Sequence, residues 1–132
     1  LRAGEGAGIT GVIMSRDTVD IYNPKVVRST MGSAFRVPFL YTDDLPGTVR
    51  ELKAGGIRLF AAHLEGRNNY EEEDYTGNTG FLIGNEGNGL TEELSAAADA
   101  WVKIPMAGKV ESLNAAIAAS ILMFETARQR RA

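Results

Sequence analysis

Two loop segments of this chain contain residue types that could bind a ligand. Residues 84–89 read GNEGNG and follow the apolar run at 81–83, and residues 105–114 read PMAGKVESLN and follow the apolar run at 101–104. Glycines at 84, 87 and 89 lack a Cβ, so the backbone can turn sharply there and contact a ligand. Loops at the carboxyl ends of strands are the usual ligand sites of α/β sheets. The two segments therefore predict a site made of backbone groups and small polar side chains.

The glycine spacing in the first segment excludes two common nucleotide-binding motifs. It reads G-x-x-G-x-G, which differs from the dinucleotide fingerprint, and no Gly-Lys-Ser or Gly-Lys-Thr follows it as in a P-loop. A loop of this composition is most often a simple turn. Glu86 among the glycines, with a helix start at Thr91 directly behind them, favours a ligand site instead.

Polar side chains also stand at the predicted start and end of the last helix. Ser112 as the helix N-cap has a sufficient structural reason to be there. Asn114, in the first turn of a helix expected to be buried, needs a polar partner, either the glycine loop or a ligand. Near the other end, Arg128, Arg130 and Arg131 are explained equally well by the helix dipole and by contact with phosphate.

Strand-like apolar runs alternate with helical segments along the chain. Strands are predicted at 9–14, 37–41, 57–62, 81–83 and 101–104, and helices at 23–32, from Asp43 or Asp44 to Lys53, at 91–98 and from Ser112 to about Arg130. Residues 65–79 are polar and predict a loop anchored by Tyr70 and Tyr75. The alternation predicts an α/β domain with a mainly parallel sheet and flanking helices.

The last predicted helix is apolar or small at almost every position from Leu113 to Phe124. A helix that is apolar on all sides must be buried on all sides, and a domain this small covers only one face. We expect the other face to meet a second subunit, which predicts a homodimer. The alternative is a central helix surrounded by its own sheet.

Composition limits the class of protein further. The 132 residues predict one domain, and 44% hydrophobic with 23% charged residues is typical of soluble globular proteins. The sequence has no cysteine, which excludes disulfides and thiolate metal sites and suits a cytoplasmic protein. The net charge of −3 offers no basic footprint for nucleic acid, so contact with RNA would need local patches or a part outside this sequence.

Three segments, at 1–12, 81–90 and 104–125, resemble in order the three motifs of the SpoU (TrmH) branch of the SPOUT RNA methyltransferases. FLIGNEGNGL at 81–90 and IPMAGKVESLNAAIAASILMFE at 104–125 are similar to its second and third motifs, and NPKVVRSTMGSAFRVP at 23–38 is also typical. LRAGEGAGITGV at 1–12 resembles the tail of the first motif, with Arg2 on its arginine. The resemblance identifies residues 1–132 as a SpoU-type catalytic domain that lacks its first strand and any N-terminal RNA-binding domain.

The resemblance implies the SPOUT-type α/β knot, in which the C-terminal segment passes through a deep trefoil knot, and it implies a homodimer. It also implies that S-adenosyl-L-methionine binds among the knot loops, largely through backbone groups. Carried over position by position, the cofactor-binding residues are Leu82, Gly84, Asn85, Glu86, Gly87, Ile104, Pro105, Met106, Ser112 and Leu113.

The reaction implied is methyl transfer to a ribose 2′-hydroxyl of RNA, with ribosomal RNA favoured over transfer RNA and no metal required. The catalytic residues implied are Arg2, Glu86, Ser112 and Asn114. A guanidinium is not easily deprotonated, so we interpret Arg2 as a clamp on the adjacent phosphate rather than as a general base. Ser112 and Asn114 would orient the hydroxyl.

Two other classes of protein compete with this interpretation. One is a non-catalytic RNA-binding protein that kept the fold, which the presence of Arg2, Glu86 and Asn114 disfavours. The other is a nucleotide-binding α/β enzyme such as a small kinase, which the missing phosphate loop disfavours. Titration with S-adenosylmethionine separates the three classes.

Overall fold

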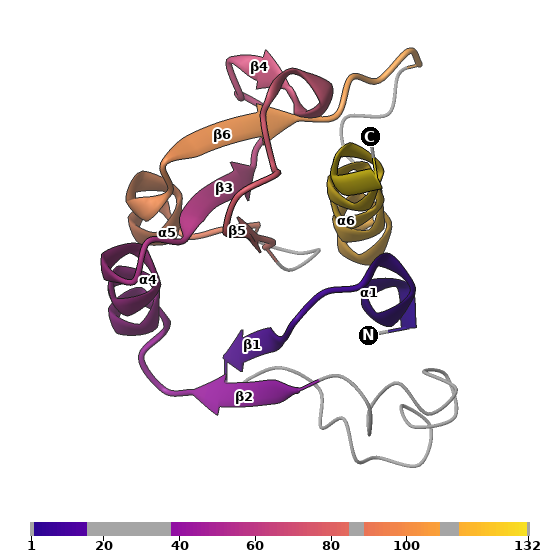
Figure 1. The fold of residues 1–132 in the computed structure, drawn as a ribbon. Helices are drawn as coiled ribbons and strands as arrows, with labels where there is room; N and C mark the ends of the chain where they lie inside the picture. Colours follow the sequence, from indigo (N-terminus) through magenta and orange to yellow (C-terminus); the bar gives the residue numbers. More distant parts are fainter. Residues whose placement is uncertain (1, 16–37, 85–88, 109–113, 132) are drawn as a thin grey trace.

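Parallel strands lie between two groups of helices in the computed structural model, which describes residues 2–15, 38–84, 89–108 and 114–131 (Figure 1). The elements in chain order are α1 (Arg2–Ala7), β1 (Val12–Ser15), β2 (Phe39–Thr42), α4 (Leu45–Ala54), β3 (Arg58–Ala62), β4 (Asn68–Asn69), the 3-10 helix η1 (Tyr70–Glu72), β5 (Thr79–Leu82), α5 (Glu92–Ala97), β6 (Ala100–Lys103) and α6 (Ala115–Arg131). In Figure 1, α4 and α5 lie on one side of the strands and α1 and α6 on the other. The α/β class with a mainly parallel sheet is confirmed.

The strands form a four-stranded sheet in the order β4-β6-β3-β5 and a two-stranded sheet of β1 and β2. Every pairing among them is parallel. β3 is therefore central, with β5 on one side and β6 on the other. Because β3, β5 and β6 run in the same direction, their carboxyl ends all lie at one edge of the sheet.

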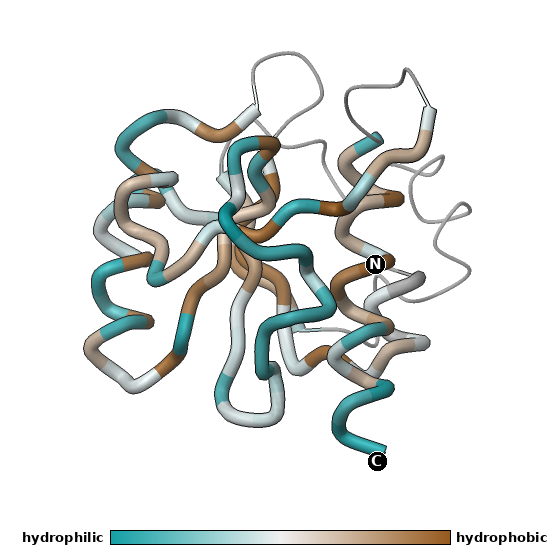
Figure 2. Tube along the Cα trace, turned by 90° about the horizontal axis from the view of Figure 1, so that it is seen from above, coloured by the Kyte–Doolittle hydropathy of each residue, from teal (hydrophilic) through white to brown (hydrophobic). Residues whose placement is uncertain are grey.

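Successive residues of β3 connect two separate core clusters. Leu59 packs with Val49 of α4 and Leu94 of α5, whereas Phe60 packs with Val102 of β6 and Leu122 of α6. This alternation is what a strand buried on both faces requires, since neighbouring side chains point to opposite faces. Figure 2 shows the apolar strands gathered in the middle and the C-terminal end of α6 hydrophilic.

The connection from β3 to β4 crosses over β6. Ala62 of β3 and Asn68 of β4 flank the same residue, Val102, from opposite sides. Gly66 lies at the crossing, where a Cβ would stand 2.7 Å from the Val102 carbonyl carbon and 2.8 Å from the Lys103 nitrogen. Only a residue without a side chain permits this approach of the two backbones.

The helix predicted after Asp43 or Asp44 is confirmed as α4. The Asp44 Oδ1 accepts a hydrogen bond from the Gly47 N–H at 3.0 Å, which caps the helix start. The helix ends at the predicted Gly55-Gly56 pair, and Gly56 has a φ of +90°. Thr91 likewise caps α5 through the Leu94 N–H, as predicted.

Three elements, namely α1, β4 and η1, were not predicted. The polar segment 65–79 contains β4 and η1 because its two strand residues pair with β6, a tertiary contact without a local sequence pattern. The glycine-rich α1 has low helix propensity, but it packs on α6. A Cβ at Gly6 would make an ordinary contact with Phe124 Cζ at 3.5 Å, whereas a Cβ at Gly4 would stand 2.5 Å from Ile9 Cδ1, so the missing side chain at Gly4 makes room for Ile9.

One face of α6 is covered and another is not, as expected for a single domain of this size, and the alternative of a central helix surrounded by its own sheet does not agree with the structure. Leu122 is fully buried against the sheet, whereas Ile117 is 52% exposed and Phe124 is 46% exposed. The face that carries the two exposed side chains is not covered by the described residues. None of the described helices is both long and apolar enough to span a bilayer.

Two predictions fall on residues outside the described ranges. The helix predicted at 23–32 lies within 16–37, which the structure does not describe. The predicted knot depends on how the chain passes through 85–88 and 109–113, which are also outside the description. The knot therefore stays a prediction from the resemblance.

Candidate functional site

The two predicted ligand loops leave the sheet from strands on either side of β3. Leu82 ends β5 and Lys103 ends β6, and both strands run parallel to β3. The segments that begin at Ile83 and Ile104 therefore start at the same edge of the sheet. This brings together two halves of the predicted site that are about twenty residues apart in the sequence.

Gly84 lies against the chain that returns toward α5. A Cβ at Gly84 would stand 2.2 Å from the Gly89 carbonyl carbon and 2.3 Å from the Leu90 nitrogen. Gly89 itself has a φ of +66°, in the left-handed region that favours glycine. The loop from 84 to 89 is thus closed at its base by backbone contact. Glycine is required at 84 for contact with the chain itself, and not only for the ligand contact that we expected from the sequence.

Ile104, Pro105 and Met106 follow β6 directly. Ile104 and Met106 are half-buried and Pro105 is exposed. On the β5 side, Leu82 and Ile83 are also half-buried. Apolar side chains that are partly accessible therefore stand beside both loops, where they could form the walls of a ligand site.

Asn114 is the N-cap of α6, which corrects the expectation that Ser112 caps this helix and that Asn114 is buried. The Asn114 Oδ1 accepts hydrogen bonds from the N–H groups of Ala116 at 2.8 Å and Ile117 at 3.3 Å. The residue is exposed. Its side-chain oxygen therefore has a structural role, and any bond from Asn114 to a ligand would have to come from the amide nitrogen as a donor.

The other predicted site residues are not placed in detail. Arg2 is the first residue of α1, but its side chain lies outside what the structure describes. The remaining predicted residues lie in the two loop segments outside the described ranges, namely Asn85, Glu86, Gly87, Ser112 and Leu113.

Two of the three arginines near the C-terminus have structural partners. Arg128 donates to both oxygens of Glu125, at 2.6 and 2.8 Å. Arg130 donates to the carbonyl oxygens of Tyr75 at 3.2 Å and Gly77 at 2.7 Å. The sequence left open whether these arginines interact with the helix dipole or with phosphate. For Arg128 and Arg130, contact with phosphate is now the less favoured explanation. Each is already engaged with its own chain.

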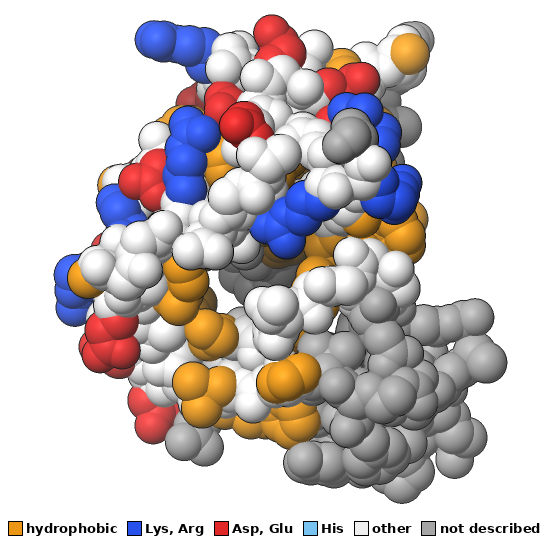
Figure 3. Space-filling model, in the orientation of Figure 1, with side chains coloured by type: hydrophobic (Ala, Val, Ile, Leu, Met, Phe, Trp, Pro, Cys, Tyr) orange, Lys and Arg blue, Asp and Glu red, His pale blue; other side chains and the backbone are white. Residues whose placement is uncertain are grey.

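Charges of both signs are mixed on the face seen in Figure 3. Lys, Arg, Asp and Glu side chains alternate over the half that contains β4, β6 and the end of α6. Hydrophobic side chains are exposed over the half with β1 and β2, where Leu40 is 57% exposed.

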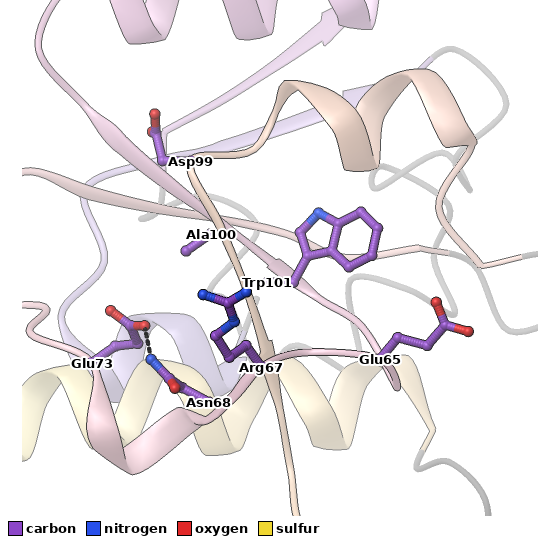
Figure 4. Close-up of a pocket in the computed structure, with 7 residues that line it drawn as sticks. All are labelled: Glu65, Arg67, Asn68, Glu73, Asp99, Ala100 and Trp101. Carbon is purple, nitrogen blue, oxygen red and sulfur yellow. Dashed lines mark hydrogen bonds between the residues drawn. The ribbon is translucent and has the colours of Figure 1, made fainter.

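A depression of about 330 Å³ lies at the outer edge of β6 and contains none of the predicted site residues. Its lining has mixed charge and consists of Glu65, Arg67, Asn68, Glu73, Asp99, Ala100 and Trp101. In Figure 4 the Asn68–Glu73 pair and Glu65 lie at opposite sides of the view, with Arg67 and Trp101 between them. Asn68 Nδ2 donates to Glu73 Oε1 at 2.8 Å. These side chains are partly satisfied by one another, which favours a structural role.

One aromatic pair at the carboxyl edge of the sheet was missed from the sequence. The ring of His63, just after β3, stacks on Trp101 of β6, with centroids 4.2 Å apart and an angle of 15° between the planes. His63 Nδ1 accepts from the Glu65 N–H at 3.1 Å, and Trp101 Nε1 donates to the Ser95 carbonyl at 2.7 Å. Since the residues are 38 positions apart, only the pairing of β3 with β6 could have predicted the contact.

Comparison with known proteins shows which family the chain matches. The model of the SpoU rRNA Methylase family matches residues 1–124. Over 130 residues the chain is 35% identical to the 23S rRNA (guanosine-2'-O-)-methyltransferase RlmB of Xanthomonas campestris pv. campestris, and the match covers 98% of this chain and 52% of that protein. The chain thus spans about half the length of the curated relatives it matches.

Solved structures agree with the sequence comparison. The SpoU methyltransferase AviRb from Streptomyces viridochromogenes, in complex with the cofactor AdoMet, is 36% identical with a TM-score of 0.87, over 98% of this chain and 53% of that one. The AdoMet-bound rRNA methyltransferase from Sinorhizobium meliloti is 39% identical with a TM-score of 0.85, over 96% of this chain and 49% of that one.

Proposed function

This chain belongs to the SpoU rRNA Methylase family, and from that premise we propose that it transfers a methyl group from S-adenosylmethionine to a ribose 2′-hydroxyl of RNA. We propose ribosomal RNA as the substrate class, because similar proteins are named as 23S rRNA methyltransferases. Residues 1–132 would then form the catalytic domain of a longer enzyme. Since the substrate would be ribosomal RNA, we also propose a cytoplasmic location.

One observation carries the proposal. The segments that follow β5 and β6 start at the same edge of the sheet, on either side of β3. These are the two segments that resemble the second and third motifs of the family. A ligand held between strand ends in this way is the usual arrangement in α/β proteins.

The residues beside the two loops fit S-adenosylmethionine. Leu82, Ile104 and Met106 offer half-buried apolar side chains that suit the adenine ring. At Gly84 the absence of a side chain lets the two ends of the loop meet, which keeps the base of the loop narrow beside these apolar residues. The cofactor would thus be held by Leu82, Gly84, Asn85, Glu86, Gly87, Ile104, Pro105, Met106, Ser112 and Leu113.

The residues of the chain would mainly align the reacting groups. When bound, S-adenosylmethionine supplies a methyl group on a sulfonium, which is already a strong electrophile. Arg2 would bind the phosphate next to the target ribose and stabilise the charge that develops on the 2′-oxygen as its proton leaves. Glu86 and Ser112 would shape the site around the hydroxyl, and Asn114 would donate to it from its amide nitrogen.

We further propose a homodimer through the uncovered face of α6. Ile117 and Phe124 are 52% and 46% exposed, which is costly for a helix this apolar unless a partner covers it. Replacing Phe124 by Asp should dissociate the dimer, since an unpaired carboxylate would be buried at the interface. A monomer at micromolar concentration for the unmodified protein, by light scattering, would contradict the proposal.

Calorimetric titration with S-adenosylmethionine tests the proposed activity, together with transfer of labelled methyl to unmodified ribosomal RNA. Arg2→Ala should leave the Kd for the cofactor within about 2-fold and lower transfer on the order of 100-fold, because the partner of Arg2 is the RNA. Transfer RNA assayed in parallel distinguishes the alternative substrate. Cofactor binding without transfer to either RNA would favour the non-catalytic alternative.

A further inference from the structure

The C-terminal part of α6 is bonded to the chain segment just before β5. Gln129 Oε1 accepts from the Tyr75 N–H at 2.7 Å, and Gln129 Nε2 donates to the Glu73 carbonyl at 2.9 Å. Arg130 adds bonds to the carbonyls of Tyr75 and Gly77. We name Glu125, Gln129 and Arg130, with the segment 73–77 that they hold, the α6 anchor. It joins parts of the chain that are more than fifty positions apart.

A buried carboxylate orients the glutamine of the α6 anchor. Glu125 is 8% exposed, and its Oε2 accepts from Gln129 Nε2 at 3.1 Å. Hydrogen bonds from Arg128 hold the pKa of Glu125 below its usual range despite the burial. Because both the acceptor and the donor of the Gln129 amide are in use, its orientation is fixed.

The segment 73–77 is itself fixed to the sheet through Tyr75. This side chain is fully buried, with its ring 4.9 Å from Phe60 and 5.2 Å from Phe81, centroid to centroid. Its hydroxyl donates to the Tyr70 carbonyl at 2.5 Å. Burial raises the pKa of Tyr75 far above its usual value, so the hydroxyl stays a donor. A shift of α6 would therefore have to move a residue of the aromatic core.

Each side of the α6 anchor leads to one half of the proposed cofactor site. Residues 73–77 run into β5, which ends at Leu82 just before Gly84. On the other side, α6 begins immediately after Asn114. The α6 anchor therefore fixes the position of one loop-bearing element relative to the other, from the end of α6 that is far from the loops.

From this arrangement we infer that Gln129 and Arg130 are positioning residues for binding of S-adenosylmethionine. The inference rests on the proposed function. Neither side chain needs to touch the cofactor. Each acts by holding α6 in register with β5, and a small displacement of one half of a two-part site lowers the affinity of the whole.

The variant Gln129→Met tests the inference, because it keeps the length of the side chain and removes its hydrogen bonds. The Kd for S-adenosylmethionine should rise on the order of 10-fold, measured by calorimetry well below the melting temperature of the variant. The control is Lys53→Met, which removes the 2.9 Å bond from Lys53 Nζ to the Ala97 carbonyl between α4 and α5, on the other side of the sheet. It breaks a contact between two helices away from the α6 anchor, and it should leave the Kd within about 2-fold.

A second pair of variants keeps the test decisive if Gln129→Met does not fold. Arg130→Met should raise the Kd, and Arg130→Lys should restore part of the affinity because an ammonium still donates to one carbonyl. An unchanged Kd in folded anchor variants, or an equal rise in the Lys53→Met control, would overturn the inference while the proposed function stands. Failure of the unmodified protein to bind S-adenosylmethionine would instead contradict the proposed function.

Discussion

The two ends of α6 differ in how their polar residues are used. At the C-terminal end, Glu125, Arg128, Gln129 and Arg130 form a network within the helix and with segment 73–77. At the N-terminal end, one side chain, Asn114, caps the helix, and Ile117 beyond it is exposed. At the charged end, which resembled a candidate for phosphate contact, Arg128 and Arg130 are bonded to the chain itself. The plainer end leads into the segment that we propose binds the cofactor.

This difference follows from what each task demands of the residues. Holding a helix on a sheet needs donors and acceptors with fixed partners, because an unpaired buried polar group costs about 1–3 kcal/mol. Holding a cofactor through backbone groups needs close approach instead, which glycine and small residues allow. A count of charged side chains therefore points to the end of α6 that is bonded to its own chain, and away from the segment that we propose binds the cofactor.

The largest effect is expected at the loop base. Gly84→Ala would place a Cβ about 2.2 Å from the Gly89 carbonyl carbon, so the backbone must shift. We expect the melting temperature to fall on the order of 10 °C. Gly77→Ala, where a Cβ has nothing within 4 Å, is the control and should change it by about 2 °C or less. Equal melting temperatures for the two variants would refute the closed loop base.

A smaller effect is expected at the N-terminal end of α6, where two variants separate the cap from the proposed chemistry. Asn114→Ala should destabilise the protein by about 1 kcal/mol, since two N–H groups lose their acceptor. Asn114→Asp keeps the acceptor and should unfold at the same urea concentration as the unmodified protein. If the amide donates to the RNA, Asn114→Asp should nevertheless transfer methyl groups more slowly. If Asn114→Asp transferred methyl groups as fast as the unmodified protein, capping of the helix would be the only supported role of Asn114.

The smallest effect is expected at the C-terminal end and depends on pH. The pKa of Glu125 is lowered in the folded protein from an ordinary value of 4.5, mainly by hydrogen bonds from Arg128. The stabilisation that the ionised Glu125 provides is therefore fully present above the ordinary pKa of 4.5 and is lost as the pH falls through the lowered pKa of the folded protein. Glu125→Gln should be less stable at pH 7 and lose less stability on acidification, as followed by urea unfolding at several pH values. Parallel curves for the two proteins would contradict this role of the carboxylate.

Most of the sheet and its helices could be predicted because their signals are local. Asp44 and Thr91 have the residue types of helix caps, and both cap the helices predicted for them. The central strand at 58–62 is apolar after Arg58, and the glycine pair at 55–56 marks the end of the helix before it. Predicted bounds differed from the observed ones by up to three residues, as at β1, where the first residues of the apolar run precede the strand.

The features that could not be predicted depend on contacts between distant residues. The α6 anchor, the stack of His63 on Trp101 and the pairing of β4 with β6 have no local pattern. For the site, the position of the two loops at one edge followed from the motifs. The role of Asn114 as the cap did not, because Ser112 is an equally good N-cap type by sequence.

The crossing at Gly66 has a consequence for the order in which the chain can fold. Asn68 pairs with Val102, a residue that is synthesised thirty-four positions later, and among the described strands β4 has no other partner. β4 therefore cannot form before β6 has entered the sheet beside β3. Non-local parallel pairing of this kind slows folding. A nascent chain that ends before Ala100 should leave the Asn68 amide open to hydrogen exchange, and protection should arise there only together with β6, whereas the Asn69 N–H has a local acceptor in Glu72 Oε1 at 2.8 Å.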